Sequence, residues 1–264
     1  MLDIMLEEFP FSSLWNAGVF LFIAFTAVIY LFLLPQEKGH SFTRKVSFLF
    51  GLVLIFIAAG SPLNIFGRIQ FSAHIIQVII LSFIAPPLLV IGMKYNLFKK
   101  LPLLEKSVLF MSRPYIAISL FFLVLYAYHY PPIFDQARVD LYGNYIYLFL
   151  LFGSAMLLWG TLIPIPGKKQ LLYYHLFCVL GIIPLGIILM LSKDVLYHAY
   201  TDLDTFTQAL QVCLPPGQQI SEELVLLILP FQPIPEQHLG GVIWIIAGFI
   251  SFIASFIIKS KKKD

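Results

Sequence analysis

Seven apolar stretches, each about 20 residues long, alternate with polar segments along the whole chain. A helix needs about 20 apolar residues to cross the hydrocarbon core of a bilayer, so each stretch predicts one transmembrane helix. The pattern therefore predicts an all-α polytopic membrane protein with seven transmembrane helices in one membrane domain, residues 1–264. The predicted spans are residues 14–34, 46–66, 72–93, 115–131, 145–163, 171–191 and 241–258.

Composition excludes a soluble globular protein. The chain is 59% hydrophobic and only 12% charged, whereas soluble domains carry about 25% charged residues. The first apolar stretch is too long for the core of a signal peptide and follows acidic residues. We therefore interpret it as a retained span and not as a cleaved signal.

The charged residues predict how the chain is oriented in the membrane. Fourteen of the 17 Lys and Arg residues lie in the segments 35–45, 94–114, 164–170 and 259–264. Because cytoplasmic loops carry the excess of basic residues, these segments are predicted to be cytoplasmic. The N-terminus is then outside and the C-terminus cytoplasmic. The pI of about 8.7 reflects this arrangement, and we infer no nucleic-acid partner from it.

The third apolar stretch carries polar and helix-breaking residues inside predicted hydrocarbon. His74 and Gln77 are one turn apart and share a helix face. Ionisable residues within spans usually face a partner inside the bundle, so His74 is the first functional candidate. Pro86 and Pro87 lack amide donors, so we expect this helix to kink or unwind there and to be covered by neighbouring helices.

The outer segments predict where further polar groups lie. Residues 134–144 are expected to form an outer hairpin, and Asn64 and Arg68 to lie at the outer interface. Residues 192–240 form a predicted outer loop, which is longer than a packing turn needs, and such loops are often functional. Its apolar piece 224–229 is too short to cross the membrane.

Four of the six histidines are predicted at or beyond the outer membrane surface: His74, His129, His198 and His238. Neutral imidazole is a good ligand for copper, zinc or haem iron, so histidines at one depth indicate a possible metal site. The alternative is that His129 and His198, which are next to tyrosines, are interfacial polar residues. The two cysteines form no CxxC pair and indicate neither a disulfide nor a thiolate site.

Several motifs, taken in order, resemble one family over nearly the whole chain. They are Ser61-Pro62-Leu63, His74-Ile-Ile-Gln77, Ala85-Pro-Pro-Leu, His129-Tyr-Pro131, Leu196-Tyr-His-Ala-Tyr200, Glu236-Gln237 and Gly240-Gly241-Val-Ile-Trp244. The sequence resembles the bacterial cytochrome c oxidase assembly factor family CtaG, of the caa-type oxidases. The resemblance implies a seven-span, multi-pass protein of the bacterial plasma membrane.

The chain also departs from the family pattern. Members of the family that this chain resembles carry a His-x-x-Gln-His motif in the third span. In this chain Val78 stands at the position of the second histidine. The family also carries histidines in the outer half of the fifth span, where this chain has Asn144, Tyr145 and Leu148. Residues 201–233 resemble an insertion. A weakened or altered metal site therefore stays open as an alternative.

The resemblance implies an assembly factor for a haem-copper cytochrome c oxidase, and not an enzyme. Its partners would be the copper-containing oxidase subunits and the lipid bilayer, and its role would be copper delivery or insertion on the outer face. One alternative is a membrane metal or haem-binding protein with a separate role. Another is a small-solute permease. The predicted spans contain no acidic residue, which argues against a carrier coupled to protons or sodium ions.

The candidate copper ligands are His74 and His129, with His238 or a methionine completing the site. Two histidines suit Cu(I) better than Zn(II), which usually takes four ligands. The two imidazoles are then expected to approach within roughly 5 Å, because each metal–nitrogen bond is about 2 Å long. Polar residues expected to support the ligands are Gln77, Glu236 and Gln237, and Pro86 and Pro87 are assigned a structural role.

Overall fold

The computed structural model describes residues 6–35, 39–94, 113–162, 165, 167–215, 217–229 and 232–261. These ranges are helical and contain no strand. The elements are α2 (Phe11–Leu14), α3 (Ala17–Val28), η1 (Ile29–Leu33), α4 (Phe42–Gly60), α5 (Leu63–Ile69), α6 (Phe71–Ile79), η2 (Ile80–Ile84), α7 (Ala85–Gly92), α9 (Pro114–Tyr128), α10 (Pro131–Val139), α11 (Leu141–Gly160), α12 (Lys168–Leu191), η4 (His198–Tyr200), α13 (Leu203–Gln211), α14 (Glu222–Ile228) and α15 (Pro233–Lys261). Most of the predicted inner segment 94–114 lies outside the described residues.

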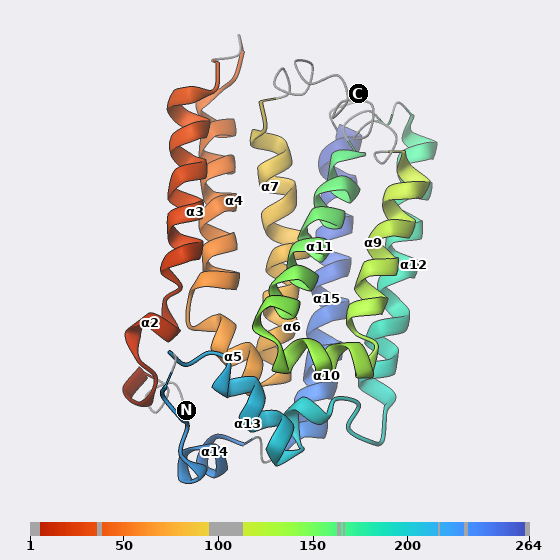
Figure 1. Cartoon of the computed structure of the whole chain (residues 1–264). Helices are drawn as coiled ribbons and strands as arrows, with labels where there is room; N and C mark the ends of the chain where they lie inside the picture. The colour runs from red at the N-terminus through yellow and green to blue at the C-terminus, as the bar shows by residue number, and fades with distance from the viewer. Residues whose placement is uncertain are drawn as a thin grey trace.

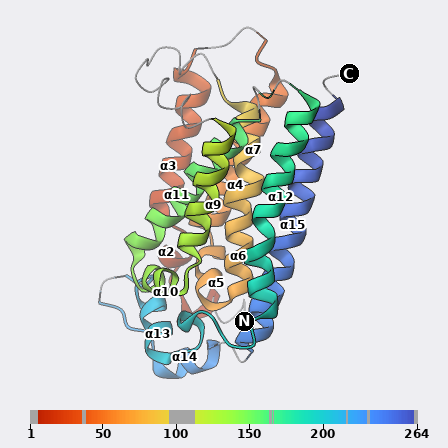
Figure 2. The same ribbon diagram turned by 90° about the vertical axis from the view of Figure 1, so that its right-hand side faces the viewer.

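The long helices run side by side along one axis and form a bundle (Figures 1 and 2). The short helices α5, α10, α13 and α14 gather at one end of this bundle, the lower end in Figure 1. Five of the described helices are long and apolar enough to cross a membrane: α4, the continuous Phe71–Gly92, α11, α12 and α15. The bent pair of α9 and α10 makes six if it is counted as one span, and Ala17–Leu33 is a shorter apolar helix.

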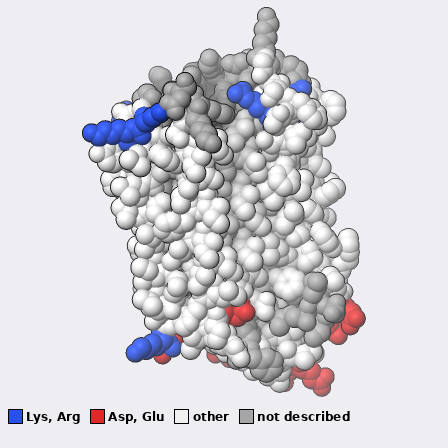
Figure 3. Space-filling model, turned by 180° about the vertical axis from the view of Figure 1, so that it is seen from behind, with Lys and Arg blue, Asp and Glu red and all other residues white. Residues whose placement is uncertain are grey.

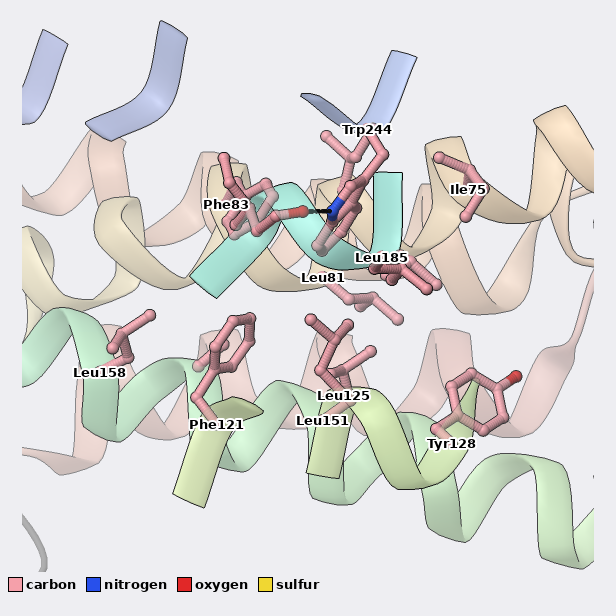
Figure 4. Close-up of a cluster of buried hydrophobic side chains, with 14 of the residues drawn as sticks. Ile75, Leu81, Phe83, Phe121, Leu125, Tyr128, Leu151, Leu158, Leu185 and Trp244 are labelled. Carbon is pink, nitrogen blue, oxygen red and sulfur yellow. Dashed lines mark hydrogen bonds between the residues drawn. The ribbon is translucent and has the colours of Figure 1, made fainter. Parts of the chain in front are cut away.

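The helix Phe71–Gly92, which comprises α6, η2 and α7, is the central helix of the bundle. Of its most apolar window 67% is buried, compared with at most 39% for the other candidate spans. It packs against α4, α5, α11 and α15. Figure 4 shows the core around it, with Leu81 and Phe83 near side chains of α9, α11, α12 and α15. Of the two prolines that were expected to be covered, Pro86 is buried and Pro87 is half-buried.

Of the kink or unwinding that the sequence predicted, unwinding does not occur, because residues 71–92 stay helical through the prolines. They occupy the first turn of α7, where a missing amide donor costs little, and the π turn η2 precedes them. Because neither Pro86 nor Pro87 can donate, the carbonyl of Ser82 lacks its usual helical partners. The indole Nε1 of Trp159 on α11 donates to that carbonyl at 2.7 Å. The neighbouring helix thus satisfies the backbone that the prolines leave open.

The outer segments are more helical than the sequence pattern predicts. The predicted hairpin 134–144 is largely the helix α10, which lies at 70° to α9. The predicted loop 192–240 ends earlier, because α15 already begins at Pro233. Within that loop α13 and α14 form a second apolar cluster with α5, through Ile69, Phe206 and Val225. The short helix α14 therefore lies on the end of the bundle.

The two ends of the bundle differ in charge (Figure 3). The acidic end carries α5, α10, α13 and α14, and its acidic residues include Asp135, Asp140, Asp194, Asp202, Asp204, Glu222, Glu223 and Glu236. The basic end carries the C-terminal ends of α7 and α15, and its described basic residues include Arg44, Lys45, Lys94, Arg113, Lys168, Lys169 and Lys259. The apolar middle between the ends is the part that a bilayer would cover.

We predict that Trp159→Phe lowers the free energy of unfolding by about 1–3 kcal/mol, because it leaves the buried Ser82 carbonyl without a donor. Phenylalanine keeps an aromatic ring at position 159, where the indole stacks on Phe252, but removes the N–H donor. Reversible unfolding of the purified protein in mixed micelles measures the change. The matched control is Trp15→Phe, at a residue that is 37% exposed and stacked on Phe56. Equal stability changes in the two variants would contradict the role of the indole N–H.

Candidate functional site

His74 lies on α6 at the acidic end and is fully buried. It faces α5, which precedes α6 in a tight helical hairpin joined at Gln70. The two helices approach so closely that a Cβ on Gly67 would stand 3.2 Å from the Cα of His74. Glycine at position 67 therefore allows α5 to cover the histidine.

His129 follows the last residue of α9, where the chain turns into α10. Its side chain is 4% exposed. Pro131 begins α10 at the position where a helix tolerates proline best, so the His-Tyr-Pro sequence ends one helix and starts the next. This turn points the imidazole back over α9, and its Nδ1 lies 2.8 Å from the Leu125 carbonyl.

The two imidazoles, which we call the histidine pair, lie with their ring centroids 5.9 Å apart. Both Nδ1 atoms face carbonyl oxygens, Gln77 Oε1 at 3.3 Å for His74 and Leu125 O for His129. A carbonyl can only accept, so each Nδ1 carries the proton and each Nε2 carries a lone pair. Both Nε2 atoms are buried without a hydrogen-bond partner. That arrangement leaves two buried imidazole nitrogens with unshared lone pairs, the form in which histidine serves as a metal ligand.

Gln77 is itself held in place, so the orientation of the His74 ring is fixed by more than one bond. The Gln77 amide nitrogen donates to the Ala58 carbonyl at 2.7 Å and to Asn64 Oδ1 at 3.1 Å. Because both of these partners are acceptors, they identify the amide nitrogen of Gln77, and the amide oxygen is the atom that faces His74. Asn64 is thus buried in the site, on the helix α5 at the acidic end of the bundle.

Two of the three fifth-span positions compared with the family's histidines hold polar residues, Asn144 and Tyr145, and the third holds the buried Leu148. The Tyr145 hydroxyl accepts from Asn16 at 3.0 Å and from Asn64 at 3.4 Å. Asn144 is fully buried, and its Oδ1 accepts from the Tyr128 hydroxyl at 3.1 Å. Tyr145 is thus linked through Asn64 and Gln77 to His74, whereas Asn144 bonds to Tyr128 and Arg138.

The remaining predicted ligands and supports lie elsewhere. His238 Nε2 is 3.0 Å from the Ser192 carbonyl. Gln237 accepts from the Leu196 amide at 2.9 Å, and Glu236 accepts from the Ser72 hydroxyl, so both connect α15 to neighbouring segments. Among the described residues, no three His, Cys, Asp or Glu side chains are grouped to hold a metal ion. The structure thus brings together His74, Gln77 and His129, but not His238.

Two buried arginines beside the pair were not singled out by the sequence pattern. Arg68 and Arg138 are 1% and 0% exposed. The Arg138 guanidinium donates to the Gly67 carbonyl, to the Tyr200 hydroxyl at 2.8 Å and weakly to Asn144 Oδ1 at 3.5 Å. Arg68 Nη1 donates to the carbonyls of Arg138 and Ala209. One feature of the sequence could have identified them. They are basic residues on the predicted outer side, whereas most basic residues lie on the cytoplasmic side.

Aromatic residues of the outer segments close over the histidine pair. The Tyr197 hydroxyl donates to the His129 carbonyl at 3.1 Å, and its ring lies 4.2 Å from that of Phe134. Phe134 in turn contacts both imidazoles. Burial raises the pKa of the Tyr200 hydroxyl, although the Arg138 charge opposes this, so the hydroxyl stays protonated and donates to Gly67. The pair is therefore shielded from the aqueous phase by a cover that belongs to η4 and α10.

Comparison with known proteins identifies one family. Residues 25–260 match the model of the cytochrome c oxidase caa3 assembly factor family, Caa3_CtaG. No curated protein and no solved structure matches the chain. The family match covers most of the sequence and includes every residue of the histidine pair and its cover. The chain therefore belongs to the cytochrome c oxidase caa3 assembly factor family.

Proposed function

We propose that this protein helps to mature a haem-copper cytochrome c oxidase by holding Cu(I) between His74 and His129 and passing it on. The observation that carries the proposal is the state of the two rings. Both Nδ1–H groups are engaged by carbonyl oxygens, and both Nε2 lone pairs are buried without a partner. Copper is then the cargo of the protein.

The donor set and its spacing favour Cu(I). Imidazole nitrogen is a suitable copper ligand, and two ligands suit Cu(I) better than Zn(II). Nitrogens that share a metal lie about 4 Å apart or less, given bonds of about 2 Å. A centroid separation of 5.9 Å is compatible with this, since each nitrogen lies at the rim of its ring. The nearby guanidinium groups disfavour permanent retention of a cation, which suits an ion that is transferred.

The orientation that fits this role has the acidic end outside and the basic end in the cytoplasm, following the excess of basic residues on cytoplasmic loops. Seven spans result if Ala17–Leu33 and α9 each cross the membrane alongside the five longer helices. The histidine pair then lies near the outer surface of the plasma membrane, on the side proposed for copper insertion into the oxidase.

We predict that a green fluorescent protein fused after Asp264 fluoresces and that the same fusion before Met1 does not. The reporter matures only in the cytoplasm, where this orientation places the C-terminus alone. Alkaline phosphatase fusions, which need the outer compartment, should give the reverse pattern. A fluorescent N-terminal fusion with a dark C-terminal fusion would move the histidine pair to the cytoplasmic side and contradict the proposal.

We predict that His74→Ala and His129→Ala each weaken Cu(I) binding by about tenfold or more, because each removes one of two ligands. Anaerobic titration of the purified protein against a chromophoric Cu(I) chelator measures the affinity, and wild type should bind one equivalent. His198→Ala is the matched control, because His198 is an exposed histidine at the same end of the bundle. Unchanged binding in both pair variants would refute the site.

The same variants separate a functional role from a structural one in cells. Oxidase activity should fall in cells that carry His74→Ala, while the amount of the assembly factor in the membrane stays at the wild-type level. Activity should be unaffected by His198→Ala. Loss of the protein itself in the His74→Ala strain would instead favour a structural role for this histidine.

A further inference from the structure

Two positive charges are buried at the acidic end without a carboxylate beside them. The described partners of Arg138 are a carbonyl, a hydroxyl and an amide oxygen, and those of Arg68 are two carbonyls. All of these acceptors are neutral. Burying a charge is costly unless an opposite charge accompanies it, so two buried guanidinium groups require a counter-charge.

The nearest acidic residue along α10 forms no ion pair with either arginine among the described residues. Asp135 lies one turn before Arg138, but its two carboxylate oxygens accept from the backbone amides of His198 and Ala199 at 3.1 and 3.0 Å. Glu236, at the start of α15, accepts from Ser72. Among the described residues, each of these carboxylates is thus engaged by another group.

The unused donors of Arg68 lie on one edge of its guanidinium group. Nη1 is occupied, whereas Nε and Nη2 are buried without a hydrogen-bond partner. These two nitrogens share the side of the planar group that points away from Nη1. Their parallel N–H bonds match the two oxygens of a carboxylate. Asn144 accepts weakly from Arg138 through its Oδ1. The amide nitrogen of the same side chain is also buried without a hydrogen-bond partner.

We propose that the Nε–Nη2 edge of Arg68 binds one carboxylate group from outside the chain. The Ala209 carbonyl of α13 accepts from Nη1, so the carboxylate would lie on the opposite side of the guanidinium group, against the edge that α13 does not use. It supplies the counter-charge that the two arginines lack. The proposal is independent of copper handling, since the guanidinium charges need compensation whether or not a metal ion is present.

Formate, the smallest carboxylate, is the probe that tests this site. The purified protein, in chloride-free detergent solution at pH 7, is titrated with sodium formate by calorimetry. We expect one saturable binding event in wild type. Arg68→Lys should weaken it by about tenfold or more, because lysine keeps the charge but lacks the planar pair of donors. Arg44→Lys, at an exposed arginine of the basic end, should bind formate as wild type does.

Hydrogen exchange of the wild-type protein locates the binding independently of any variant. Formate should slow amide exchange in α5, which carries Arg68, and leave α9 unchanged. This measurement also decides the matter if Arg68→Lys does not accumulate in the membrane. Absence of saturable binding, protection confined to other helices, or equally strong binding of chloride, which has a single charged centre, would each overturn the proposal.

A second probe distinguishes the source of the carboxylate. N-acetyl-aspartate N-methylamide presents a carboxylate as an acidic side chain of a partner protein does. Binding of both probes at the Arg68 edge supports the proposal and assigns the site to an acidic side chain of a partner. Binding of formate alone supports it and assigns the site to a small free carboxylate. Copper affinity should be unchanged in the Arg68→Lys variant, which keeps the two tests separate.

Discussion

The guanidinium group of Arg138 holds together three segments that are far apart in the sequence. It bonds to the Gly67 carbonyl on α5, to Tyr200 in η4 and to Asn144 on α11. Each of these bonds involves a charged donor, and such bonds are stronger than those between neutral groups. Because Gly67 lies against the backbone of His74, the same contacts fix the helix that carries the first histidine. This one side chain thus helps to hold α5 over His74, while Gln77 and the Leu125 carbonyl orient the two rings.

The helical architecture and the first histidine could be predicted from the sequence because both follow from the cost of polar groups in hydrocarbon. A histidine within an apolar stretch needs a buried partner, and His74 has one in Gln77. The central position of its helix follows from the two prolines, whose missing donors require covering helices. The repair itself, by the indole of Trp159 and a π turn, depends on three-dimensional packing that periodicity does not encode.

The outer segments were harder to predict because their helices are short and partly polar. The first two turns of α15 contain Glu236, Gln237 and His238, which interrupt the apolar run, so the sequence placed them in a loop. The burial of Arg68 and Arg138 could not be predicted, since burial of an arginine leaves no mark in a hydropathy pattern. Only the tertiary arrangement of α5, α10 and α13 encloses them.

The order of residues in the chain determines when the cover over the histidine pair is synthesised. Tyr197 bonds to the carbonyl of His129, which precedes it by 68 residues. During synthesis the two histidines and the helices that carry them therefore leave the ribosome well before the segment that encloses them. The growing chain passes through a stage in which the pair and α10 have been made but Tyr197 and η4 have not. Closure of the site is a late step in the biogenesis of this protein.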